Sequence, residues 1–166
     1  ITGGTVVATN DTSNVPAIGG ANTITISGGT VIATADRGGA GIGGAAEQPS
    51  GTINISGGVI TASSADEGAG IGAGYKGTLG EINISGGIIT ATGGFGAAGI
   101  GGGLKSAGGT INISGGTITA TGDYNGAGIG GGYASNDMQI VITGGNIKAT
   151  AGTNAQAVGK GGSATG

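Results

Sequence analysis

The sequence contains few of the side chains that usually do chemistry in proteins. Cysteine and histidine are absent, and the 166 residues include five basic and eight acidic side chains, for a net charge of −3. This excludes thiolate and imidazole metal sites, a cysteine nucleophile and a histidine base. Asp66 and Glu67 are adjacent, but with Arg37 and Lys76 they form no recognisable catalytic group. We therefore expect a protein that is not an enzyme and has no metal or cofactor.

Aromatic side chains recur at a spacing of 29 residues and form a candidate binding group. Tyr75 and Tyr133 are two spacings apart with Leu104 midway, and Phe95 and Tyr124 are one spacing apart. Rings beside hydrogen-bonding groups bind sugars by stacking and polar contacts. The alternative is that the rings stack over a corner of the fold and shield it. Including the lysines that follow this first set, the glycan-binding candidates are Tyr75, Lys76, Phe95, Lys105, Tyr124 and Tyr133.

The same spacing runs through the whole chain. A Ser/Thr-Gly-Gly triplet recurs with its first glycine at 3, 28, 57, 86, 115 and 144, so one interval of 25 precedes four of 29. An independent marker, the apolar residue of a Gly-Ile-Gly-like segment, follows nearly the same intervals at Ile18, Ile42, Ile71, Ile100, Ile129 and Val158. Internal repeats of 20–50 residues indicate solenoids, propellers or arrays.

Each repeat alternates apolar and polar residues with a period of two, which predicts strands. Residues 110–114, 117–121 and 126–130 are three such segments within one repeat. We therefore predict an all-β fold, a right-handed parallel β-helix with three short strands per 29-residue coil and about six coils. It forms a single domain over residues 1–166, with an irregular end at 151–166. The first strand points isoleucines inward, the second an aliphatic residue and an alanine, and the third an alanine and an isoleucine.

The second strand of each repeat points threonines outward. Their spacing resembles that of β-solenoid antifreeze proteins, so ice binding is one hypothesis, although Val59, Ile88, Asn146 and Lys148 interrupt the grid. The alternative is that threonine simply suits a solvated strand. The ice-binding candidates are Thr90, Thr92, Thr117, Thr119 and Thr121.

The third strand places glycines where the others place outward side chains. A face without side chains lets another backbone approach closely, so we predict that Gly70, Gly99 and Gly128 form a close-packing face for self-association or for another protein. The alternative is that a loop of each coil, such as residues 131–136, folds over this face.

Residues 111–122 and 126–132 resemble the glycine-rich repeats of large bacterial cell-surface proteins, especially Gram-positive adhesin-like proteins. The resemblance implies an extracellular location at the cell surface, and a chain that is a fragment of a longer surface protein. No apolar run is long enough for a membrane span, and five basic residues are too few for a nucleic-acid-binding surface. The expected function is that of a non-enzymatic stalk or adhesive domain whose partner is a polysaccharide or another protein surface.

Overall fold

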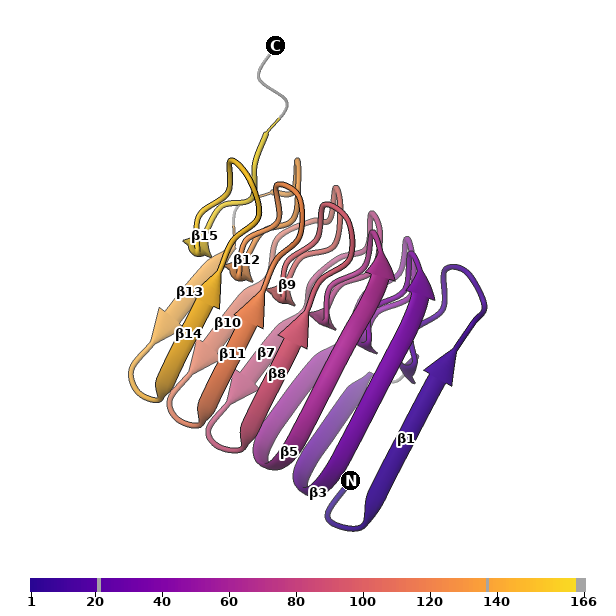
Figure 1. Ribbon diagram of the computed structural model, residues 1–166, viewed down its shortest axis with the longest axis vertical. Coiled ribbons are helices and arrows are strands. Elements are labelled where there is room, and N and C mark those ends of the chain that lie inside the picture. Colours follow the sequence, from indigo (N-terminus) through magenta and orange to yellow (C-terminus); the bar gives the residue numbers. More distant parts are fainter. Residues whose placement is uncertain (21, 137, 164–166) are drawn as a thin grey trace.

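The chain forms a parallel β-solenoid in which equivalent strands of successive coils lie side by side (Figure 1). The computed structural model describes residues 1–20, 22–136 and 138–163, and this part contains strands and no helix. It has about five coils of about 29 residues, one fewer than predicted. The difference arises at the N-terminus, where β1 (Thr5–Asn10) and β2 (Ile18–Gly19) supply only the second and third strands of a coil.

All strand pairs are parallel and form two sheets, one of nine strands and one of six. In β3 (Thr23–Arg37) and β5 (Thr52–Asp66) the first and second strands of a coil run continuously through the Gly-Gly corner. In the later coils these strands are separate: β7 (Glu81–Ile84), β8 (Ile88–Thr92), β10 (Thr110–Ile113), β11 (Thr117–Thr121), β13 (Gln139–Ile142) and β14 (Asn146–Thr150).

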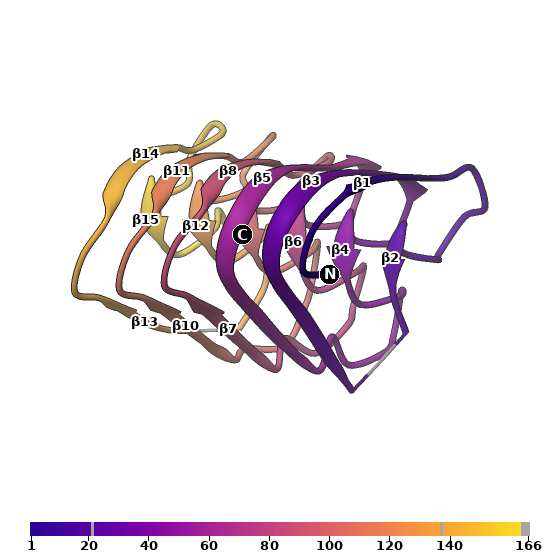
Figure 2. The same ribbon diagram turned by 90° about the horizontal axis from the view of Figure 1, so that it is seen from below.

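The third strands have two residues each and lie between the two arms that the first and second strands form (Figure 2). They are therefore shorter than the five-residue segments predicted from the sequence. Besides β2, they are β4 (Ile42–Gly43), β6 (Ile71–Gly72), β9 (Ile100–Gly101), β12 (Ile129–Gly130) and β15 (Val158–Gly159).

The core consists of the predicted inward columns, stacked in register. Ile53, Ile82 and Ile111 pair directly from coil to coil, and each is fully buried. Burying one such side chain contributes about 1.5–3 kcal/mol. Because one coil cannot bury its own inward face, the stack rather than the single repeat is the stable unit.

Each Gly-Gly corner depends on a left-handed backbone at its second glycine. Gly87 has φ +98°, and a Cβ there would lie 3.1 Å from the carbonyl oxygen of Gly58 in the preceding coil. A residue with a side chain is strained in this conformation and is also crowded by the neighbouring coil. The corners consequently stack closely along one edge of the solenoid.

On the outer face of the first strands, three asparagines form the amide ladder that their spacing suggests. Asn83 donates through Nδ2 to Oδ1 of Asn54 at 3.0 Å, and Asn112 donates to Oδ1 of Asn83 at 2.9 Å. The column ends at Thr25 and Val141, which have no amide to continue it.

We expect Asn83→Ala to lower the free energy of unfolding by about 1–2 kcal/mol, because it breaks both ladder bonds and each contributes about 0.5–1.5 kcal/mol. Urea denaturation followed by circular dichroism measures the change. Thr25→Ala, at the end of the same column, is the control. An equal loss in both variants would contradict a role for the ladder.

Candidate functional site

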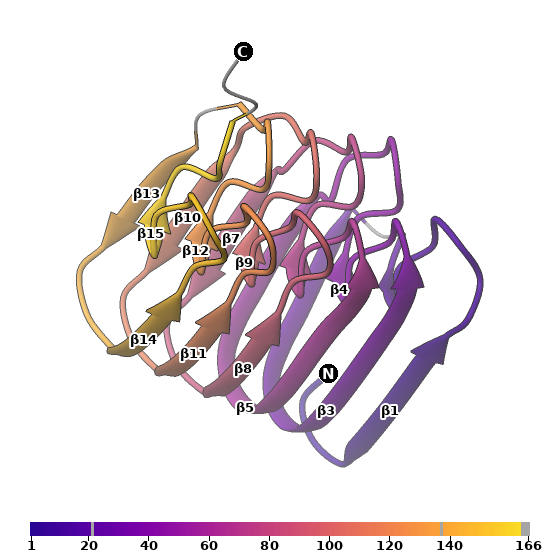
Figure 3. The ribbon, with the colours of Figure 1, turned by 45° about the horizontal axis from the view of Figure 1, so that its top comes forward.

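Two loops of each coil meet along the edge opposite the Gly-Gly corners (Figure 3). One loop follows the second strand and the other follows the third. A line of backbone hydrogen bonds of 2.6–3.0 Å joins them across neighbouring coils. We call this the loop edge. The amides of Ala46, Tyr75, Leu104, Tyr133 and Gly162 donate, respectively, to the carbonyl oxygens of Asn14, Gly38, Glu67, Gly96 and Asn125.

The residues that accept these bonds all have a left-handed backbone, with φ between 61° and 78°. This conformation turns the chain sharply, and it places the preceding residue of each coil in one column. Glycine and asparagine adopt it readily, whereas Glu67 does so less easily. The column that precedes the turns consists of Ser13, Arg37, Asp66, Phe95 and Tyr124.

All four aromatic residues of the chain lie on the loop edge. Phe95 and Tyr124 stack with ring centroids 4.9 Å apart and an interplanar angle of 9°, and they are 48% and 49% exposed. Tyr75 and Tyr133 are half-buried, and Leu104 between them is buried. The fold thus brings together two candidate pairs that the sequence analysis treated separately.

The two candidate lysines extend the same edge. Lys76 and Lys105 are exposed, and each follows a residue of the column formed by Ala46, Tyr75, Leu104 and Tyr133, which we call the Tyr75 column. The Nζ of Lys76 lies 5.0 Å from the centroid of the Tyr75 ring, within the range of a cation–π contact. Every glycan-binding candidate from the sequence therefore lies on the loop edge.

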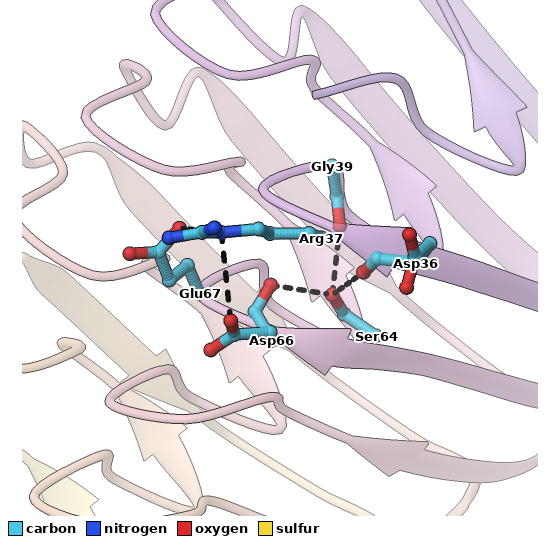
Figure 4. A network of polar contacts seen from close by, with 6 residues as sticks. All are labelled: Asp36, Arg37, Gly39, Ser64, Asp66 and Glu67. Atoms are coloured by element: carbon cyan, nitrogen blue, oxygen red, sulfur yellow. Dashed lines mark hydrogen bonds and ion pairs between the residues drawn. The ribbon is translucent and has the colours of Figure 1, made fainter. Parts of the chain in front are cut away.

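A hollow of about 290 Å³ opens at the N-terminal part of the loop edge. Within it, Nε of Arg37 lies 3.2 Å from Oε2 of Glu67, and it is also 3.6 Å from Oδ2 of Asp66 (Figure 4). Asp66, Glu67 and Arg37 are the residues that the sequence suggested together, with Lys76, as a group without a recognisable catalytic pattern, and the fold brings these three into contact. The hollow is lined by Ser13, Asn14, Arg37, Glu67 and Tyr75.

A buried hydroxyl holds the chain behind this group. Oγ of Ser64 donates to the carbonyl oxygen of Gly39 at 2.8 Å, and the carbonyl oxygens of Asp36 and Asp66 lie 3.2 and 3.3 Å away (Figure 4). Ser64 is 5% exposed. Its hydroxyl ties the turns of two coils together, so that Arg37 and Asp66 project from a fixed backbone.

The surroundings of Arg37 and Asp66 shift the pKa of both groups upward. Desolvation and the charge of Glu67 raise the pKa of Asp66, and the charge of Arg37 opposes them. The hydrogen bond from Arg37 to Glu67, together with the charge of that carboxylate, raises the pKa of the guanidinium. Ionised Asp66 is therefore less favourable in the folded chain than in the unfolded one.

We expect Asp66→Asn to raise the free energy of unfolding relative to wild type more at pH 7 than at pH 3. The folded-state pKa of Asp66 lies above its ordinary value, so its contribution to stability is present at low pH and is lost as the pH rises through the raised pKa. Because Asp66 is 40% exposed, the change is below about 1 kcal/mol. Thermal denaturation at both pH values measures it, and a difference that falls with rising pH would contradict the assignment.

The glycines predicted to form an exposed packing face are buried. A Cβ on Gly99 would lie 2.6 Å from the amide nitrogen of Thr121 and 2.9 Å from the carbonyl oxygens of Ala91 and Gly128. Gly70 and Gly128 are enclosed in the same way. The prediction of a face open to a second protomer is therefore wrong, because the third strands lie between the two arms. The covering backbone comes from the ends of the second strands, rather than from the loop at 131–136.

The outward residues of the second strands form a sheet surface that we call the threonine face. Thr90, Thr92 and Thr117 are exposed, and Thr119 and Thr121 are half-exposed. None of these five hydroxyls has a hydrogen-bond partner within the described ranges. One column of this face has a hydroxyl in every coil: Thr9, Thr34, Ser63, Thr92, Thr121 and Thr150.

In the described part of the chain, no helix is long and apolar enough to span a membrane. Residues 24–46, 53–75, 82–104 and 111–133 each match the model of a family described as β-helix repeat. A search of curated proteins and a search of solved structures each gave no significant match. Each matched segment starts in a first strand and ends on the loop edge at the Tyr75 column.

Proposed function

The chain belongs to the β-helix repeat family and is a structural repeat domain, and from this premise we propose that it binds a polysaccharide along its loop edge. In this proposal the domain is extracellular, stands at a bacterial cell surface as a stalk or adhesive segment, and does no catalysis. The glycan ligand lies along the edge, parallel to the stacking direction of the coils.

The observation that carries the proposal is the gathering of all four aromatic rings on one edge. Phe95 and Tyr124 keep about half of their surface exposed although they stack on each other. Exposed rings beside polar groups suit the apolar faces and hydroxyls of sugars. Successive coils repeat this surface about every 4.8 Å, which suits a ligand that is itself a chain of similar units.

The carboxylates of Asp66 and Glu67 both contact the guanidinium of Arg37, with oxygens 3.6 Å and 3.2 Å from Nε. In this proposal they are polar groups of the binding edge, and the domain does no catalysis.

A glycan array, followed by calorimetry on the best polysaccharide, tests the proposal. We expect the double variant Phe95→Ala/Tyr124→Ala to bind at least tenfold more weakly than wild type. The matched control is Ile32→Ala/Val59→Ala, which removes side chains of similar exposure, 40% and 46%, from the threonine face. Equal affinity of the stack variant and wild type would overturn the proposal, as would a wild-type chain that binds no glycan.

Ice binding is the second candidate, and the unbroken hydroxyl column of the threonine face favours it. Lys148 is the one charged residue among the outward positions of that face. Thermal hysteresis of the wild-type chain is the test. Activity that Thr92→Lys removes, and that Thr25→Lys on the first-strand face leaves intact, would support this function. Hysteresis no greater than that of an unrelated protein would exclude it.

A further inference from the structure

We infer that the hollow between Ser13, Asn14, Arg37, Glu67 and Tyr75 binds one neutral pyranose residue, with the sugar ring against Tyr75. The inference rests on the proposed function and deepens it, because it assigns a ligand class and a position to one end of the loop edge. The hollow does not include Phe95 or Tyr124, so the inference and the proposed function can be tested separately.

The aromatic column is interrupted next to Tyr75. The equivalent position in the preceding coil is Ala46, whose amide donates to the carbonyl of Asn14 at 3.0 Å, just as the amide of Tyr75 donates to Gly38 at 2.8 Å. The four aromatic residues of the chain lie at positions 75, 95, 124 and 133, so no ring continues the column beyond Tyr75 toward the N-terminus. On that side the hollow is lined by Ser13 and Asn14.

The ring of Tyr75 has a cationic neighbour, the ammonium of Lys76, which lies 5.0 Å from the ring centroid. Lys76 is not among the residues that line the hollow, so the proposal places the sugar on the part of Tyr75 that lines the hollow rather than beneath this ammonium. An aromatic surface at the wall of a small polar hollow is the arrangement that stacks against the CH groups of a pyranose.

The other residues that line the hollow supply both hydrogen-bond donors and hydrogen-bond acceptors. Arg37 is a donor, the carboxylate of Glu67 is an acceptor, and the amide of Asn14 and the hydroxyl of Ser13 can act as either. Sugar hydroxyls also donate and accept, so they match this mixture. The volume of about 290 Å³ lies just below the range for ligand pockets, about 300–1,000 Å³, and suits one ring rather than an oligosaccharide.

The charge at the hollow selects against acidic sugars. One guanidinium faces two carboxylates, those of Asp66 and Glu67, and the carboxylate of Asp36 is close enough to act on Asp66. A uronic acid would add another carboxylate to a group that already has an excess of them, whereas a neutral pyranose avoids this repulsion.

The polar groups are held in place before any ligand arrives. Arg37 ends the long strand β3, and its side chain, although 61% exposed, contacts both carboxylates. Asn14 lies directly over Gly38, where its Oδ1 occupies the space that a Cβ would need. Such preorganisation reduces the ordering that binding requires.

Nuclear magnetic resonance titration of the full chain with single sugars tests the inference. The probes are glucose, galactose and mannose, with glucuronic and galacturonic acid as their acidic counterparts. We expect at least one neutral sugar to shift the amide signals of Asn14, Glu67 and Tyr75, and to bind at least tenfold more tightly than either acid. Tyr75→Ala should weaken this binding at least tenfold and Tyr75→Phe should restore it, while Tyr133→Ala, in the same column, should change it less than twofold.

The outcomes separate this inference from the proposed function. Loss of polysaccharide binding in the Phe95→Ala/Tyr124→Ala variant, with no sugar-induced shifts at the hollow, would overturn the inference and leave the proposed function in place. If sugars shift the signals at the hollow, but the Phe95→Ala/Tyr124→Ala variant binds polysaccharide as tightly as wild type, the proposed function is overturned and the inference about the hollow stands. Acidic sugars that bind as tightly as neutral ones, or equal losses in Tyr75→Ala and Tyr133→Ala, would also overturn the inference.

Discussion

Replacing Gly99 with valine is expected to lower the free energy of unfolding by about 3 kcal/mol or more, a large fraction of the stability of a typical domain. The first atom of the new side chain meets backbone on three sides: the amide nitrogen of Thr121 at 2.6 Å and two carbonyl oxygens at 2.9 Å. Backbone cannot rotate away as the end of a flexible side chain can. The solenoid would have to separate its third strand from the arm that covers it.

Gly3→Val is the matched control, because a Cβ at Gly3 meets nothing within 4 Å. Circular dichroism during urea titration gives the unfolding free energy of both variants. Gly3→Val should stay within about 0.5 kcal/mol of wild type, as surface substitutions usually do. If Gly99→Val is as stable as Gly3→Val, the enclosed position of the third strand is incorrect.

The column of Gly70, Gly99 and Gly128 shows which part of the fold the sequence pattern did not predict. Alternation along residues 126–130 correctly indicated a strand and correctly placed Ile129 inward. It also implied that Gly128 faces outward into solvent. That implication is correct only for a strand that has solvent on one side. The third strand has two residues and lies between two arms, so both of its faces meet the chain itself. Periodicity reports which residues alternate, but it does not report what covers the second face.

The core was predictable because parallel strands in register convert sequence spacing directly into spatial neighbours. Ile53, Ile82 and Ile111 are 29 residues apart and pair as expected. The glycine markers count six corners, whereas the described part of the chain has five first strands, so about five coils form rather than about six.

The loop edge was predictable only in part. Spacing placed Phe95 next to Tyr124, and they stack. The meeting of the two loops of each coil was not predictable, because it depends on left-handed turns at residues such as Glu67, Lys76 and Lys105. These residue types do not favour that conformation, so the tertiary packing rather than local preference imposes it. The sequence suggested Arg37 and Glu67 as members of one group, but the left-handed turn at Glu67 that accompanies their contact was not predictable.

A second large effect is expected from Ile84→Ala, which should lower the free energy of unfolding by about 2–5 kcal/mol. Ile84 is 1% exposed and pairs with Ile55 and Ile113 in the neighbouring coils. Removing three carbons leaves a cavity in the middle of the column, and the in-register strands on both sides restrict its collapse. The loss therefore includes the transfer free energy of the removed atoms and the contacts of the residues that lined the cavity.

Comparison with Ile142→Ala separates the effect of packing between neighbouring coils from the effect of replacing an isoleucine as such. Ile142 occupies the same column in β13, the last first-strand in the stack, and is 40% exposed because β10 alone pairs with it among the described strands. We expect Ile142→Ala to lower the unfolding free energy by less than about 1.5 kcal/mol, since it removes a side chain that is already partly in water. Chemical denaturation of both variants gives the comparison. Equal losses would mean that a coil is stabilised by its own residues, whereas the larger loss at Ile84 requires that each coil is stabilised by the coils on both sides of it.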